Sequence, residues 1–310
     1  MSVSVFFNLI RWKNLVLIAL MQFYTEYFLL SNFGFETTLS NSLLYLLIIS
    51  TFLITASGYI INDIIDVKGD VINKPNKVII TKNISIANAL KLYRIGAFLG
   101  IIIGSYIAFK IQKPFYSFYF VGILALLYFY SKYLKGKMLI GNFVVSILLA
   151  FSMIVVLLFD FPSSLNSLQS DLYLKIQSVI IMYSVFAFLL NFIREIIKDI
   201  EDVDGDYNQN YRTLPIIIGK KRTRNIAISI TLFTLFLLLV VTFNLVDILT
   251  ITFSYIIVLI VIPLIYFTYK LWSAETLKSY NHLSKVLKII ILLGIISIPL
   301  ISIYIKNAFN

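Results

Sequence analysis

The sequence has no cysteine and only one histidine, His282. The lack of cysteine excludes disulfide bonds, thiolate metal ligands and cysteine nucleophiles. A single histidine argues against a histidine-ligated metal centre and against a histidine-based catalytic triad. The side-chain chemistry that these absences leave open is that of carboxylates and other oxygen ligands.

Charged residues are also scarce. Only 13% of the 310 residues are charged, 60% are hydrophobic, and the mean hydropathy is +0.93. These values lie outside the range of soluble domains and predict a membrane protein. Arg11 and Lys13 precede the apolar run 14–30 like the basic flank of a signal anchor, but no small-residue cleavage site follows, which favours a retained first helix.

Long apolar runs divide the rest of the chain. A helix needs about twenty mostly apolar residues to cross a bilayer, and fewer where Lys, Tyr and Trp reach the interface. Nine runs meet this requirement and predict an all-α, polytopic fold with nine transmembrane helices: 14–30, 43–61, 92–109, 115–130, 138–159, 172–192, 226–245, 248–267 and 286–305.

Basic residues are distributed unevenly between the two sides of these nine spans. If the spans alternate, 22 of the 26 Lys and Arg residues share the side of the N-terminus. By the positive-inside rule that side is cytoplasmic, and the predicted location is the cell (inner) membrane. The net charge of +11 then reports topology, and no nucleic-acid partner is needed to explain it.

Acidic residues gather in two segments, 62–77 and 194–206, which follow the second and the sixth span. Aligning Asp63 with Asp199 makes six of eight positions identical, including Asp66 with Asp202 and Asp70 with Asp206. Both segments emerge on the same side because four spans separate them. This pattern predicts one membrane-embedded domain, residues 1–310, with a weak parallel internal repeat whose two copies converge on one site.

Within each copy the aspartates stand at positions i, i+3 and i+7, which places them on one helical stripe. Six carboxylates at one membrane surface would repel each other by several kcal/mol unless a multivalent cation compensated them. An all-oxygen set suits Mg²⁺, which takes a few carboxylates and substrate phosphate oxygens. A solvent-exposed loop that binds no metal would also be rich in charged residues, but the repeated spacing favours a metal–diphosphate site.

The motif Asn62-Asp63-x-x-Asp66-x-x-x-Asp70 resembles the first motif of the UbiA superfamily of intramembrane prenyltransferases, and the segment 199–206 resembles the second. Supporting similarities are Arg11-Trp12-Lys13-Asn14, Tyr130 to Lys135 with Gly141-Asn142, and Arg212 to Pro215. The chain departs from the pattern at Lys77, where many relatives have arginine, and in the missing proline after Trp12. Lysine keeps the charge at position 77 but loses the two-pronged phosphate contact.

The resemblance implies a helical bundle around a central cavity, capped on the cytoplasmic side by two aspartate loops. It implies transfer of an isoprenoid chain from a prenyl diphosphate to a lipid-soluble acceptor, with two Mg²⁺ ions. The partners are these two substrates and membrane lipids, with no obligatory protein partner evident. The implied catalytic and metal-binding residues are Asp63, Asp66, Asp70, Asp199, Asp202 and Asp206, and the implied substrate-binding residues are Asn62, Arg11, Lys77, Lys135, Asn142, Arg194 and Lys198.

The acceptor is the open question. The second motif looks most like the branch of (di)geranylgeranylglyceryl phosphate synthases, whose acceptor is a glycerol phosphate lipid. An aromatic acceptor, such as 4-hydroxybenzoate or a menaquinone or haem precursor, would use the same metal site. Two other classes remain: a CDP-alcohol phosphotransferase, which would keep its aspartates in one Gly-rich segment, and a secondary transporter, which would place its polar site near the bilayer midplane.

Overall fold

The computed structural model describes residues 2–35, 38–73, 78–162, 165–243 and 250–309. Within these ranges it contains nine helices, some of them interrupted, that are long and apolar enough to cross a membrane. The prediction of nine transmembrane helices is confirmed. Lys77, one of the predicted substrate-binding residues, lies outside the described residues.

The helices follow one another along the chain with short connections. In chain order they are α1 (Val3–Leu9), α2 (Trp12–Tyr24), the π-helix η1 (Thr25–Leu30), η2 (Ser31–Phe33), α3 (Asn41–Asn73), α4 (Ile86–Lys110), η4 (Pro114–Tyr116), α5 (Ser117–Phe129), the π-helix η5 (Tyr130–Leu134), α6 (Ile140–Phe159), α7 (Ser167–Asn208), α8 (Leu214–Ile218), α9 (Lys220–Phe243), α10 (Thr250–Ile256), the π-helix η6 (Ile257–Val261), α11 (Ile262–Trp272), α12 (Leu277–Ile296) and α13 (Ile298–Phe309).

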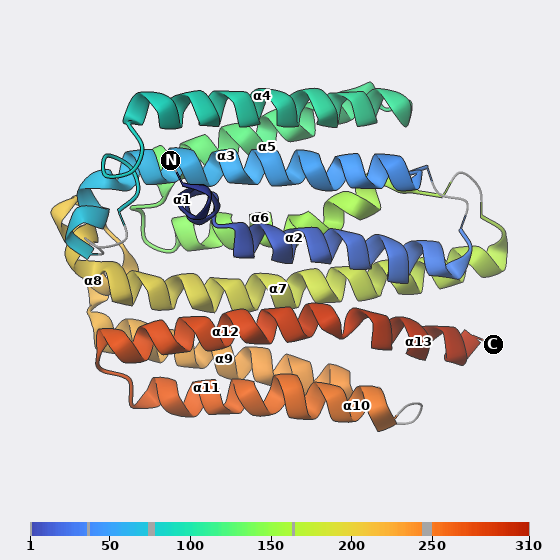
Figure 1. Cartoon of the computed structure of the whole chain (residues 1–310). Coiled ribbons are helices and arrows are strands. Elements are labelled where there is room, and N and C mark those ends of the chain that lie inside the picture. Colours follow the sequence, from blue (N-terminus) through green and yellow to red (C-terminus); the bar gives the residue numbers. More distant parts are fainter. Residues whose placement is uncertain (1, 36–37, 74–77, 163–164, 244–249, 310) are drawn as a thin grey trace.

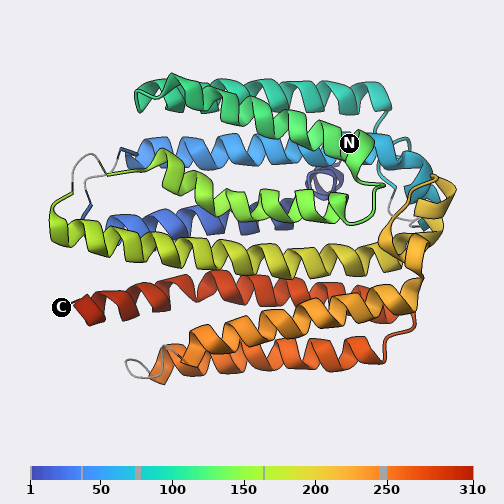
Figure 2. The ribbon, with the colours of Figure 1, turned by 180° about the vertical axis from the view of Figure 1, so that it is seen from behind.

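The long helices lie side by side, with α7 through the middle of the bundle (Figure 1). On one side of it α4 and α5 pack on α3, which Figure 2 shows from behind; on the other, α9, α11 and α12 pack together. Helices α3 and α7 run in the same direction, so their C-terminal ends lie at the same end of the molecule, drawn at the left in Figure 1. We call this the aspartate end.

Helices α3 and α7 are much longer than a membrane requires. They contain 33 and 42 residues. At 1.5 Å per residue their lengths are about 50 and 63 Å, against about 30 Å for the apolar core of a bilayer. Their C-terminal turns carry the two aspartate motifs. The expected aspartate loops are therefore wrong, because residues 62–73 and 194–206 are helical. The i, i+3, i+7 spacing turns the carboxylates to one face, while Ile196, Ile197 and Ile200 of α7 are buried on another.

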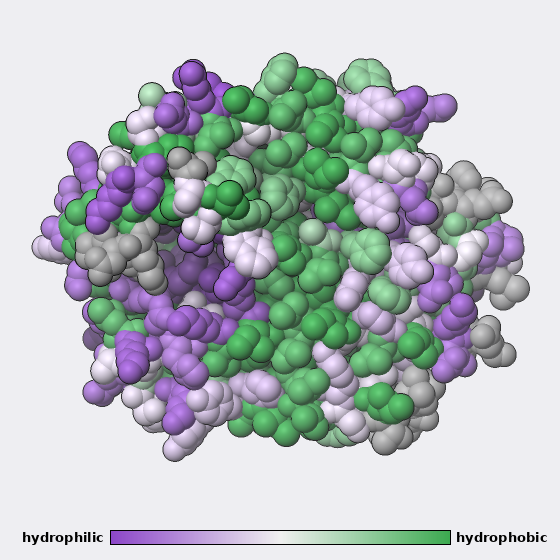
Figure 3. Space-filling model, viewed as in Figure 1, coloured by the Kyte–Doolittle hydropathy of each residue, from purple (hydrophilic) through white to green (hydrophobic). Residues whose placement is uncertain are grey.

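The outer surface matches a protein that lies in a bilayer. Figure 3 shows a hydrophobic band across the middle of the molecule and hydrophilic residues at both ends. Large apolar side chains such as Phe98, Phe118 and Phe236 are more than 60% exposed. Such exposure is unfavourable in water and favourable in lipid.

Small residues allow the helices to approach closely within this bundle. A Cβ atom added to Gly104 of α4 would lie 2.4 Å from the ring of Phe120 in α5. Close approach over glycine is the usual means of packing helices in a membrane, where lipid removes the hydrophobic driving force between them.

Candidate active site

A cavity of about 840 Å³ opens between the two aspartate motifs. Residues of α2, α3, α5, α6, α7 and α12 line it, and Figure 3 shows the hydrophilic hollow at the aspartate end. All twelve predicted site residues that the structure describes line this one cavity: Arg11, Asn62, Asp63, Asp66, Asp70, Lys135, Asn142, Arg194, Lys198, Asp199, Asp202 and Asp206.

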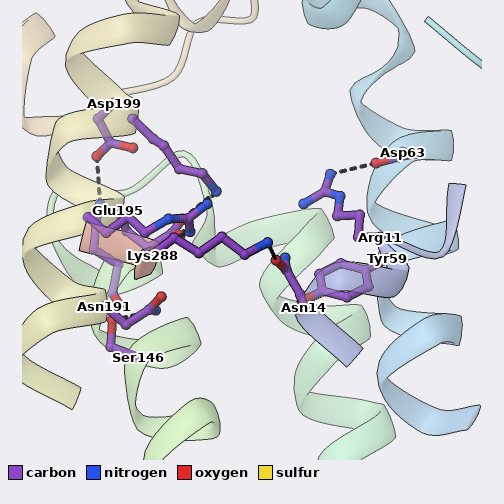
Figure 4. Close-up of polar contacts among 12 residues, drawn as sticks. Arg11, Asn14, Tyr59, Asp63, Ser146, Asn191, Glu195, Asp199 and Lys288 are labelled. Carbon is purple, nitrogen blue, oxygen red and sulfur yellow. Dashed lines mark hydrogen bonds and ion pairs between the residues drawn. The ribbon is translucent and has the colours of Figure 1, made fainter. Parts of the chain in front are cut away.

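Arg11 joins the N-terminal segment to the first motif. Its Nη2 donates to Asp63 Oδ1 at 2.7 Å, and its guanidinium lies 4.9 Å from the centre of the Tyr59 ring. Arg11 connects α1 to α2 in a left-handed conformation, with φ 50° and ψ 48°. A non-glycine residue adopts this conformation at a cost of about 1–2 kcal/mol. The residue in this turn is the one whose side chain contacts Asp63 (Figure 4).

Asp66 is the most deeply buried carboxylate of the first motif, with 2% of its surface exposed. Its Oδ2 accepts from Asn62 Nδ2 at 2.6 Å and from Lys135 Nζ. Its Oδ1 is buried, and no hydrogen-bond partner lies within reach of it in the part of the chain that the structure describes. An ionised carboxylate oxygen in that position is suited to a cation or a donor from a ligand.

Lys135 reaches Asp66 because of a local irregularity. The π-helical turn Tyr130–Leu134 precedes it, and its backbone N–H donates to the carbonyl of Tyr130 at 2.9 Å. Such insertions into helices are frequent at functional sites. Burial lowers the pKa of the Lys135 ammonium, but the charge and hydrogen bond of Asp66, together with the electrostatic effects of Tyr130 and Asp206, outweigh it, and the pKa is raised above its usual range. Lys135 therefore stays charged.

The second motif is anchored by a chain of hydrogen bonds from α6. Asn142 Nδ2 donates to Asp199 Oδ2 at 2.8 Å. Ser146 Oγ donates to the Asn142 carbonyl at 2.7 Å, and Asn191 Nδ2 donates to Ser146 Oγ at 3.2 Å. Figure 4 shows Ser146 of α6 beside Asn191 of α7, with Asp199 further along α7. Their bonds fix the direction in which Asp199 presents its carboxylate.

Arg194 and Lys198 share a carboxylate that the sequence did not single out. Arg194 Nη1 donates to Glu195 Oε1 at 2.8 Å, and Lys198 Nζ lies 3.1 Å from the same oxygen. All three residues line the cavity. One carboxylate between two cations leaves this group with one net positive charge.

Gly69 lies where the two aspartate segments approach each other. Helix α3 continues past it to Asn73. A Cβ at this position would lie 1.7 Å from Gln209 Nε2, just beyond the second motif. A few residues further along, the backbone N–H of Arg212 donates to the carbonyl of Gly136 at 2.7 Å. This bond joins the segment after α7 to the connection between η5 and α6. Glycine therefore allows the two aspartate segments to close one end of the cavity.

Other cavity residues were missed from the sequence. They include Tyr59, Asn191, Glu195, Gln209 and Lys288. From the sequence, Lys288 counts among the 22 basic residues on the side of the N-terminus, and the structure places it inside α12, which starts at Leu277. The sequence does contain a signal for a functional residue here, because a lysine at position 288 interrupts the apolar run 286–305.

The donor set has the composition of a Mg²⁺ site. Six aspartates line the cavity, and carboxylate oxygen is the ligand this ion prefers. In the described ranges, no group of three or more His, Cys, Asp or Glu side chains could by itself hold a metal ion. Mg²⁺ is usually held by one or two carboxylates and completed by water and substrate phosphates. By donor chemistry the residues fit this ion.

Residues 19–300 match the model of the UbiA prenyltransferase family. The chain belongs to this family. Curated relatives named digeranylgeranylglyceryl phosphate synthase are similar over most of its length. The protein of Sulfurisphaera tokodaii is 30% identical over 268 residues, which cover 85% of this chain and 88% of that one. The protein of Methanosphaera stadtmanae is 31% identical over 246 residues, 79% of this chain and 83% of that one.

Solved structures of UbiA-type proteins have the same fold. One, described as digeranylgeranylglyceryl phosphate synthase in membranes, has a TM-score of 0.64 at 24% identity and covers 97% of this chain and 98% of its own. A UbiA homologue from Archaeoglobus fulgidus bound to DMAPP and Mg²⁺ has a TM-score of 0.59 at 16% identity, covering 94% and 98%.

Family membership decides between the enzyme classes left open by the sequence. The chain is a multi-pass membrane prenyltransferase. The two alternatives, a CDP-alcohol phosphotransferase and a secondary transporter, are not supported by these matches.

Proposed function

We propose that this protein transfers an isoprenoid chain from a prenyl diphosphate to the hydroxyl of a geranylgeranylglyceryl phosphate-type lipid, with Mg²⁺ at the aspartate end. The observation that carries the proposal is that twelve residues drawn from distant parts of the sequence line one cavity. The acceptor class is supported by relatives named digeranylgeranylglyceryl phosphate synthase at 30% and 31% identity.

Two ions would be held between the aspartates of the first and second motifs, with the buried Oδ1 of Asp66 as one donor. When bound, Mg²⁺ neutralises the diphosphate and makes it a better leaving group. The chain itself orients the carboxylates: Arg11 and Asn62 hold the first motif and Asn142 holds the second. Lys135 adds a positive charge at the boundary between the motifs.

The cavity has walls of two kinds, as an amphiphilic substrate requires. Beyond the charged end, Ile123, Leu127, Val145, Leu148 and Leu149 line it. Apolar walls would take the isoprenoid chain and exclude water from the reacting carbon. The polar end would take the diphosphate.

In the proposed reaction the acceptor hydroxyl oxygen forms a bond to C1 of the isoprenoid. The bond from C1 to the diphosphate oxygen breaks with its electron pair on the diphosphate, and the hydroxyl proton is released. Positive charge develops on the allylic carbons as the bond breaks, and aromatic faces can stabilise it. Of 20 Tyr and 26 Phe residues, the aromatic side chains that line the cavity are Tyr59, Tyr119 and Tyr130. Arg11 already covers a face of Tyr59, which favours the other two.

We place the aspartate end on the cytoplasmic side of the cell membrane. The support is the excess of Lys and Arg on that side of the predicted spans. The single domain over residues 1–310 and its weak internal repeat remain part of this proposal.

The test is product formation by the purified protein in lipid nanodiscs. Geranylgeranyl diphosphate is supplied with geranylgeranylglyceryl phosphate, 4-hydroxybenzoate or dihydroxynaphthoate, with Mg²⁺ or with EDTA. We expect prenylation of the glycerol phosphate lipid, dependent on Mg²⁺. Product from an aromatic acceptor alone would overturn the acceptor, and no product from any acceptor would overturn the activity.

Two substitutions on α7 test the role of the motif. Asp202 lines the cavity, whereas Asp204 is exposed two residues later on the same helix. Both Asp202→Asn and Asp204→Asn remove one negative charge and keep the side-chain shape. We expect Asp202→Asn to lower turnover by at least about a hundredfold, because several kcal/mol of transition-state stabilisation depend on charge at the metal site. Asp204→Asn should retain wild-type turnover, and equal loss in both would contradict the assignment.

A further inference from the structure

Lys288 is a charged side chain in an apolar part of the bundle. It is the twelfth residue of α12, which begins at the aspartate end at Leu277 (Figure 1). At 1.5 Å per residue it lies about 16 Å along the helix. Its neighbours Leu287 and Ile290 are fully buried, while Lys288 itself is only partly covered and lines the cavity.

The partner of Lys288 is neutral. Its Nζ donates to Asn14 Oδ1, and Figure 4 shows the side chain extending toward Asn14. Asn14 Nδ2 in turn donates to the hydroxyl of Tyr59 at 3.3 Å. Among the ion pairs of the described residues, none involves Lys288. The charged groups that act on it most are two other cations, Arg194 and Lys13.

An ammonium in this environment needs a negative partner. A charge inside a membrane span is costly unless it is paired, and an intramembrane lysine is therefore a candidate for ligand binding. The neighbouring Arg194 has a buried Nε with no hydrogen-bond partner in the described part of the chain. Within the described ranges, two cationic side chains on different helices thus line the same cavity without an anionic partner from the opposite helix.

The charges of this cluster match a phosphate monoester. Arg194, Lys198 and Lys288 contribute three positive charges, and Glu195 contributes one negative charge. The net charge is +2. A phosphate monoester carries about −1.5 to −2 at neutral pH and has three strong acceptor oxygens.

The depth of the cluster also suits the headgroup of a membrane lipid. Arg194 lies five residues before Asp199 on α7, which is roughly 7 Å closer to the middle of the membrane. The aspartates stand on helix turns that extend past the apolar core. A phosphate held by Arg194 and Lys288 would therefore lie on the membrane side of the aspartates, within reach of a lipid whose chains extend into the bilayer.

We propose that Lys288, with Arg194 and Lys198, binds the phosphate of the acceptor lipid, apart from the aspartates that hold the donor diphosphate. Lys288 is then a specificity-determining residue, because it distinguishes an acceptor with a phosphate from one without. This inference rests on the proposed function and names the part of the cavity that each substrate occupies. Asn14 holds the ammonium in place when the acceptor is absent.

The test is steady-state kinetics of Lys288→Met in nanodiscs, with the donor and the acceptor varied separately. The KM for geranylgeranylglyceryl phosphate should rise about tenfold or more, the effect of losing one hydrogen bond between charged groups. The KM for geranylgeranyl diphosphate should stay within about twofold, since a change of that size is under 0.5 kcal/mol. Lys288→Arg should recover most of the acceptor affinity because it restores the charge.

Lys285→Met is the matched control. Lys285 is exposed on the same helix, one turn before Lys288, and does not line the cavity. Its loss should leave both KM values unchanged. If Lys288→Met does not purify as a homogeneous protein, Lys288→Gln and Lys288→Arg provide the same comparison.

Each outcome separates this inference from the function on which it rests. If wild-type protein prenylates the lipid and Lys288→Met raises the KM of the diphosphate instead, the site belongs to the donor and the inference is overturned. It is also overturned if neither KM rises. If wild-type protein makes no product with the phosphorylated acceptor, the proposed function is wrong, and the inference that rests on it is wrong as well.

Discussion

Magnesium should stabilise this protein against unfolding, because the cavity carries an excess of carboxylates. Among the residues that the structure describes, seven carboxylates line it, the six motif aspartates and Glu195, against five cations: Arg11, Lys135, Arg194, Lys198 and Lys288. The net charge is −2, and two Mg²⁺ ions would change it to +2. A ligand that binds only the folded state at a hundred times its Kd stabilises that state by about 2.7 kcal/mol. At about 2–4 °C per kcal/mol, the unfolding midpoint should rise by roughly 5–10 °C.

The assay is thermal unfolding in detergent, followed by the fluorescence of Trp12 and Trp272, at increasing MgCl₂ and constant ionic strength. Constant ionic strength separates binding from screening, because any salt weakens repulsion between exposed carboxylates. Asp66→Asn removes the buried carboxylate and should abolish most of the shift. Asp204→Asn removes an exposed one and should retain it. A midpoint that does not move with Mg²⁺, or that moves equally in both variants, would refute the metal model.

Two further predictions concern single contacts. Asn142→Leu removes the donor to Asp199 and should lower single-turnover rates by about tenfold or more, the effect of one hydrogen bond to a charged group; an unchanged rate would show that Asp199 needs no such orientation. Gly104→Ala brings a Cβ to 2.4 Å from the Phe120 ring and should lower the free energy of unfolding by about 1–3 kcal/mol. Gly122→Ala meets no atom within 4 Å and should cost nothing, so equal unfolding midpoints for the two variants would contradict this packing.

The ends of the helices show where hydropathy stops being informative. The run 172–192 predicts a span, yet α7 continues to Asn208 and α3 continues from its predicted end at 61 to Asn73. Hydropathy detects only the part of a helix that lipid surrounds. The remaining turns are held by contacts with other helices and are polar toward the cavity, so their composition resembles that of a loop.

The number of spans and the two aspartate motifs were determined by the sequence itself. Apolar runs long enough to cross a bilayer have few alternatives to a helix, because lipid offers no partners for backbone N–H and C=O groups. The repeated spacing of Asp63, Asp66 and Asp70 is a local property as well, and a local property can be read without knowing the fold.

Only the tertiary structure decided which side chains share the cavity. Lys288 facing Asn14 and Gln209 over Gly69 are contacts between parts of the chain that meet only through packing. Asn14 and Lys288 are 274 positions apart in the chain. A lysine inside an apolar run signals that a charge must be satisfied, but which neutral or anionic group satisfies it depends on how α2 and α12 pack, and no local pattern encodes that.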